Sequence, residues 1–85
     1  MVRSIHIFAP KSYQREIDTV LDHCPNVNRK RIVDCDDGEN FQIIFICVDK
    51  HLSSILLSLE STGLGVEFGS IEICALESTI PEIKS

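Results

Sequence analysis

The order of strand-like and helix-like apolar patterns is the feature that most constrains the fold of this chain. An alternating segment, an amphipathic segment, two apolar segments joined at Asp37-Gly38, a second amphipathic segment and a final alternating segment fill nearly all 85 residues. Alternation with a period of two predicts strands, and spacings of three and four predict helices. The resulting β-α-β-β-α-β order predicts an α+β, ferredoxin-like (split βαβ) two-layer sandwich. We expect an antiparallel sheet of order 4-1-3-2 with both helices on one face.

The first half of the chain predicts a strand over residues 4–8, which Pro10 ends. Ser12 is a suitable N-cap for the helix that follows, and Pro25 stops that helix. A second strand is expected over residues 29–35. The helix would present one apolar face, formed by Tyr13, Ile17, Val20, Leu21 and Cys24.

The middle of the chain predicts a hairpin. Residues 36–40 are polar, and Gly38 can take the positive φ that a tight turn requires. Residues 41–48 are apolar at almost every position. Because a strand with two apolar faces needs cover on both, we predict that this strand lies in the centre of the sheet.

The second helix is expected to begin with Asp49 as its N-cap and to stop before Gly63. The last strand is expected over residues 66–76. The predicted core is a set of apolar side chains drawn from the strands and both helices: Ile5, Ile7, Ile17, Val20, Leu21, Ile44, Ile46, Leu52, Ile55, Leu56, Leu59, Ile71 and Ile73.

The end of the chain differs from the rest, because residues 77–85 show no periodicity. We therefore predict one domain over residues 1–76, followed by a flexible C-terminal tail or the start of a linker over residues 77–85. A chain of this length provides only one small core.

The net charge of −5 argues against a nucleic-acid partner, because phosphate binding requires a positive surface. The one basic run, Arg29-Lys30-Arg31, is followed at once by acidic residues. Charges on an edge strand also prevent sheets from pairing edge to edge, which is the simpler explanation of this run.

The four cysteines, at positions 24, 35, 47 and 74, form no C-x-x-C pair. They are typical of reduced, mostly buried thiols in a cytoplasmic protein. The N-terminus lacks a secretory signal pattern, and no apolar run reaches the length of a membrane span. A cytoplasmic location is therefore predicted.

The sequence predicts no metal, no cofactor and no catalytic residue. A zinc site around His23 and Cys24 would require ligand spacings that do not occur. The cluster Lys11-Ser12-Tyr13 has no general base or orienting carboxylate placed beside it by the sequence. We therefore predict that the protein is not an enzyme.

Two functions of different classes stay open. In the first, the sheet face opposite the helices is an interaction surface for self-association or docking. Strand alternation assigns four apolar side chains to that face: Phe8, Ile43, Phe45 and Cys47. In the second, the chain is an effector sensor of the amino-acid-binding (ACT) type, with its site at the strand–helix loops formed by Pro10, Lys11, Ser12, Gly63 and Gly65.

The stretch from Gly63 to Ile73 resembles a known family. A leucine-rich helix end, a Gly-x-Gly step and Phe-Gly-Ser-Ile at the start of the last strand are similar to the soluble N-terminal domain of an uncharacterised group of multi-span membrane proteins, "domain of unknown function 389". The resemblance extends over most of residues 1–76. It implies a cytosolic domain that is followed by a membrane domain in the same chain, and it supplies no catalytic residues.

Overall fold

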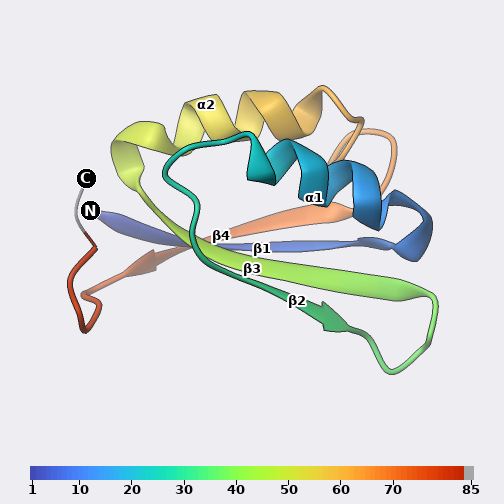
Figure 1. Cartoon of the computed structure of the whole chain (residues 1–85), viewed down its shortest axis with the longest axis horizontal. Coiled ribbons are helices and arrows are strands. Elements are labelled where there is room, and N and C mark those ends of the chain that lie inside the picture. Colours follow the sequence, from blue (N-terminus) through green and yellow to red (C-terminus); the bar gives the residue numbers. More distant parts are fainter. Residues whose placement is uncertain (84–85) are drawn as a thin grey trace.

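The computed structural model describes residues 1–83, in which two helices cover one side of a four-stranded antiparallel sheet (Figure 1). The α+β class and the β-α-β-β-α-β order are confirmed. Across the sheet the strands follow the order β2-β3-β1-β4. The elements, in chain order, are β1 (Val2–Pro10), the 3-10 helix η1 (Lys11–Tyr13), α1 (Gln14–Asp22), β2 (Asn28–Asp34), β3 (Asn40–Val48), α2 (Asp49–Glu60) and β4 (Ser70–Leu76).

Strands β1 and β3 form the centre of the sheet, which confirms the central position predicted for residues 41–48. β1 pairs with β3 along its whole length, from Val2↔Val48 to Pro10↔Asn40. β4 pairs with the other edge of β1, and β2 pairs with β3. The outer strands β2 and β4 are therefore the two edges.

The core lies between the sheet and the helices. In β3 it takes the odd-numbered residues, so the prediction that Ile44 and Ile46 belong to the core is wrong. Ile73, also predicted in the core, keeps 44% of its surface exposed because it lies on the edge strand β4. The fully buried apolar side chains are Ile5, Ile7, Ala9, Ile17, Leu21, Phe41, Ile43, Phe45, Cys47, Ile55, Leu59 and Leu64.

The last strand begins at Ser70 and not at residue 66 as predicted. A loop comes before it, in which Gly63, Gly65 and Gly69 all have positive φ, at 97°, 81° and 64°. A strand of L-residues requires negative φ, so this backbone cannot continue as a strand until Gly69 has been passed.

Both predicted N-caps are wrong. Ser12 lies inside η1, and the N-cap position of α1 is Tyr13. Asp49 is the first residue within α2, because Val48 occupies the N-cap position. The Asp49 carboxylate accepts a hydrogen bond from Arg3 Nε at 3.0 Å, so it joins the start of α2 to β1.

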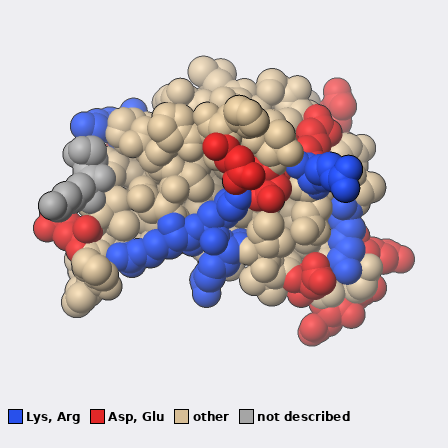
Figure 2. Space-filling model, viewed as in Figure 1, with Lys and Arg blue, Asp and Glu red and all other residues tan. Residues whose placement is uncertain are grey.

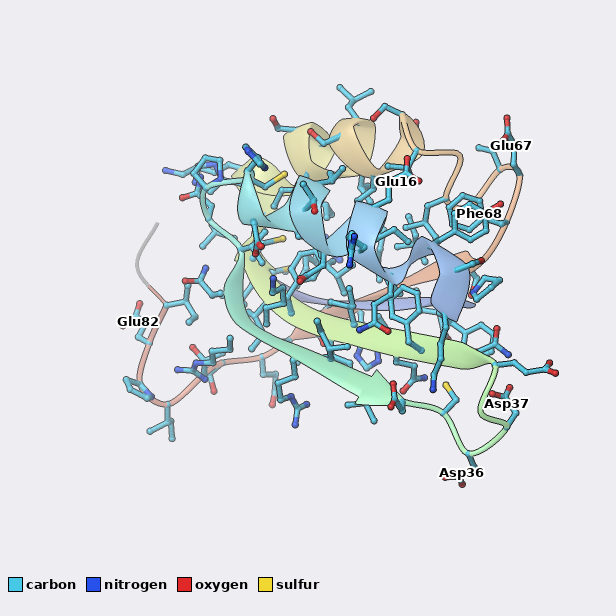
Figure 3. The ribbon with its side chains drawn as sticks, turned by 45° about the vertical axis from the view of Figure 1, so that its right-hand side comes forward. Glu16, Asp36, Asp37, Glu67, Phe68 and Glu82 are labelled. Atoms are coloured by element: carbon cyan, nitrogen blue, oxygen red, sulfur yellow. The ribbon has the colours of Figure 1, made fainter. Side chains whose placement is uncertain are left out.

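The β2–β3 hairpin has the turn that the sequence predicts, with Gly38 at φ 73°. The Asp37 carboxylate accepts hydrogen bonds from the backbone N–H groups of Glu39 (2.8 Å) and Asn40 (3.0 Å), and from the Asn40 side chain (2.6 Å). These donors, the Asn40 side chain foremost, hold the pKa of Asp37 below the usual value for a carboxyl group. Figure 3 shows Asp36 and Asp37 at the tip of the hairpin, far from the helices.

Because the pKa of Asp37 is lowered in the folded state, its charge contributes stability above the ordinary carboxyl pKa, and that contribution is lost as the pH falls through the lowered value. We expect Asp37→Asn to be less stable than the wild type at neutral pH. The difference should shrink as the pH falls through the lowered pKa of Asp37, because the Asp37 carboxyl group then loses its charge. Urea unfolding of the two proteins at several pH values measures this. A difference that stays constant with pH would contradict a role for the charge.

Candidate functional site

The predicted interaction face is wrong for β3, because the prediction assigned the buried set of alternating residues to it. Ile43, Phe45 and Cys47 are fully buried against the helices, and only Phe8 lies on the opposite face, where 39% of it is exposed. The register with β1 decides this, because Ile5 pairs with Phe45 and β1 buries its odd-numbered residues. Burial raises the pKa of the Cys47 thiol, which makes Cys47 a poor nucleophile as well as an inaccessible one.

The open sheet face, as we call the side opposite the helices, is therefore formed by the other residue set of each strand. In the pairing register, these side chains form rows across all four strands. Apolar and polar side chains are mixed on this surface. The members from β1 and β3 are Val2, Ser4, His6, Phe8, Gln42, Ile44, Ile46 and Val48, and those from the edges are Arg31, Val33, Ser70, Glu72, Cys74 and Leu76.

One row of the open sheet face carries charge at both ends. Arg31 on β2 pairs with Ile44, Ile44 with His6, and His6 with Glu72 on β4. Ser4 Oγ lies 2.9 Å from His6 Nε2, so these two polar groups satisfy each other within the face. The row is thus positive at the β2 edge and negative at the β4 edge.

The basic run of β2 is divided between the two sides of the sheet. Lys30 reaches the helix side, where its ammonium group donates hydrogen bonds to the carboxylates of Asp18 and Asp22 on α1. These bonds raise the pKa of Lys30, the bond to Asp18 most of all. In Figure 2, a stripe of Lys and Arg side chains lies directly beneath a group of acidic side chains.

A groove of about 490 Å³ crosses the open sheet face beside β2. Its lining includes the apolar Ile44 and Ile46 together with Arg29 and Arg31. Arg29 Nη2 also donates a hydrogen bond of 2.7 Å to the carbonyl oxygen of Pro81, so the segment after β4 is joined to β2. The groove therefore combines an apolar floor with a cationic rim.

The loops predicted to bind an effector do lie side by side. Tyr13 stacks on Phe68, with ring centroids 3.6 Å apart and an interplanar angle of 9°. Figure 3 shows Phe68 in the loop between α2 and β4, beside η1. This stack fills the space between the two loops with side chains.

The individual loop residues have different surroundings. Pro10 ends β1, and Lys11 and Ser12 lie in η1, where the Lys11 N–H donates to the carbonyl oxygen of Glu39 at 2.9 Å. Gly65 lines a groove of about 350 Å³ between α2 and β4, and the lining of that groove does not include residues 10–12. Gly63 lies in the turn that follows α2, where its N–H donates a hydrogen bond to the carbonyl oxygen of Glu60 at 2.9 Å. The structure thus brings the two loops together without placing all five residues around one cavity.

His23 and Cys24, which were considered above as zinc ligands, follow directly after α1. His23, Cys24 and His51 line one small groove where the end of α1 meets α2. Within residues 1–83, no three His, Cys, Asp or Glu side chains are placed to hold a metal ion together. In the same range, no helix has both the length and the apolar character required to cross a membrane.

Sequence reasoning missed Ile44, Arg31 and Glu72 as members of the open sheet face. One signal could have found the correct parity, because Gln42 is the only polar residue between positions 41 and 48. The set that contains Gln42 belongs on the less buried side, and that set includes Ile44.

No family model matches the chain, and no curated protein matches it. The solved structures that share its fold include the two that follow. CPII from Thiomonas intermedia K12, solved with bound ADP, AMP and acetate, superposes with a TM-score of 0.70 at 13% identity, over 86% of this chain and 83% of CPII. SnoaB, a cofactor-independent oxygenase from Streptomyces nogalater, was solved as a variant and superposes with a TM-score of 0.55 at 17% identity, over 95% of this chain and 97% of SnoaB. The chain is therefore similar in fold to a protein that was solved with adenine nucleotides bound and to an oxygenase.

Proposed function

We propose that this chain is a non-enzymatic regulatory domain that acts by self-association or docking through the open sheet face. The observation that carries this proposal is that β3 is apolar on both sides, whereas the helices cover only one side. Ile44, Ile46 and Val48 are only half-buried, and Phe8 and Val33 are 39% and 44% exposed. Covering these side chains would remove apolar surface from water, at about 25 cal/mol per Å².

The proposal includes the context that the family resemblance implies. The domain would be the cytosolic N-terminal part of a longer protein whose membrane domain follows residue 85. Neither a metal nor a catalytic reaction belongs to this function. In such a protein, association of the soluble domains would change the assembly of the membrane domains to which they are joined.

The test compares two aspartate variants on opposite sides of the molecule. Ile44→Asp places a charge in the middle of the open sheet face, whereas Leu57→Asp places one on the outer surface of α2, where Leu57 is 68% exposed. In sedimentation velocity over a wide range of concentrations, we expect the wild type and Leu57→Asp to self-associate and Ile44→Asp to stay monomeric. A monomeric wild type at the highest concentration, or equal loss of association in both variants, would refute self-association through this face.

A second candidate function is small-molecule sensing of the ACT type. The groove beside Gly65 favours it, because its walls combine apolar Leu64 and Ile71 with the carboxylate of Glu60. CPII, which has a similar fold, was solved with ADP, AMP and acetate bound. Titration of the labelled domain with amino acids and with adenine nucleotides would reveal such a site by chemical-shift changes confined to residues 10–13 and 63–71. Changes spread over the open sheet face would favour the first function instead.

A further inference from the structure

We propose that the partner of the open sheet face is a second copy of this chain, related to the first by a twofold axis that runs parallel to the strands between β1 and β3. This inference rests on the proposed function and deepens it by naming the partner and its orientation. In this arrangement, the Arg31 side chain of each copy lies opposite the Glu72 side chain of the other.

The row formed by Arg31, Ile44, His6 and Glu72 motivates this orientation. Arg31 and Glu72 lie on opposite edges of the sheet, in register with Ile44 and His6. Three strand spacings separate them, or about 14 Å, which exceeds the screening length of about 8 Å at physiological salt. Both side chains are exposed, and neither makes an ion pair or a side-chain hydrogen bond with another of residues 1–83. Each charge is therefore available to a partner.

A twofold axis parallel to the strands exchanges the edges of the two sheets. It places β2 of one copy over β4 of the second copy, and at the same time β4 of the first over β2 of the second. The positive end of each row then meets the negative end of the other row, so one sequence supplies both halves of two identical ion pairs. Sheets that pack face to face keep their strands within about 30° of each other, which preserves this alignment.

The other twofold axis that stacks the two faces lies across the strands, and the charges disfavour it. That axis places β2 over β2, so that Arg29 and Arg31 of the two copies meet. Like charges facing each other across an interface weaken binding strongly. Of these two orientations, both of which keep the strands aligned, the charge pattern of the row favours the one with the axis parallel to the strands.

The remaining surface fits the selected orientation. β3 of one copy lies over β1 of the second copy, so Val48 faces Val2, and Ile46 and Ile44 face Ser4 and His6. The Ser4 and His6 side chains already lie within hydrogen-bond distance of each other, at 2.9 Å. The segment after β4 lies at the end of the sheet formed by Met1, Val48 and Leu76. It therefore leaves the charged row in the middle of the sheet accessible.

The experiment exchanges the charges one at a time and then mixes the variants. Arg31→Glu leaves two acidic ends on each row, and Glu72→Arg leaves two basic ends. We expect each single variant to self-associate about tenfold more weakly than the wild type, because two favourable pairs become two repulsive ones. An equimolar mixture of the two should form a heterodimer about as strong as the wild-type dimer, because both pairs are then complementary. The double variant Arg31→Glu/Glu72→Arg should dimerise like the wild type.

Sedimentation velocity measures the association, native mass spectrometry with one variant isotopically labelled identifies the heterodimer, and circular dichroism verifies folding. Arg15→Glu is the matched control, because it makes the same charge change at an exposed position of α1. If the wild type dimerises and Ile44→Asp does not, but the mixture is no stronger than the single variants, the pairing is wrong and the proposed function stands. If the wild type does not associate at all, the proposed function itself fails.

Discussion

Phe45→Asp is expected to abolish folding, whereas Ile44→Asp, one residue earlier, is expected to leave the domain folded. Phe45 is fully buried beneath the helices, and Ile44 lies on the open sheet face. Removing a buried phenylalanine side chain costs about 3–5 kcal/mol, and burying a carboxylate without a partner adds a desolvation penalty. The sum is comparable to the stability of a domain of this size, which is about 4–13 kcal/mol at about 0.05–0.15 kcal/mol per residue.

Far-UV circular dichroism and the dispersion of amide proton shifts distinguish the two outcomes. The variants carry the same substituent in the same strand, so β-propensity and net charge affect them equally. Folded Phe45→Asp together with unfolded Ile44→Asp would mean that β3 presents its other face to the helices. In that case both the open sheet face and the dimer built on it would be wrong.

Gly69→Ala is expected to lower the free energy of unfolding by about 3 kcal/mol, well beyond the cost of φ alone. A Cβ at Gly69 would lie 2.6 Å from the carbonyl oxygen of Phe8 and 2.9 Å from Leu64 Cδ1. The first of these atoms belongs to the backbone of the central strand β1, so it cannot move without disturbing the sheet. The φ of +64° adds a further strain of about 1–2 kcal/mol for any L-residue other than glycine.

Gly38→Ala is the matched control, because Gly38 has a similar φ of +73° but no atom lies within 4 Å of the position that an alanine methyl group would take there. It should lose only about 1 kcal/mol. Urea unfolding of the two variants against the wild type measures the difference, which isolates the close approach of the α2–β4 loop to β1. Equal losses in the two variants would contradict that close approach.

The candidate site was less predictable than the fold. Reasoning from the sequence found that one sheet face would carry apolar side chains, and it placed Phe8 there correctly. It assigned the wrong half of β3 to that face, because residues 41–48 are apolar at both parities and alternation alone cannot distinguish them. It also treated the Arg29–Arg31 run as one group, although the pairing of β2 with β3 sends Lys30 to the helices and Arg31 to the open sheet face.

Local chemistry was sufficient to determine the order of the elements, the turn at Gly38 and the buried stripes of the helices, because each depends on residues that are close together in the chain. The tertiary structure alone decided which side of β3 is buried, since that depends on its register with β1. It also decided that β4 begins only after Gly69, where the loop packs against Phe8. Arg31 and Glu72 come to lie in one row only through three successive strand pairings, and no local pattern in the sequence carries that information.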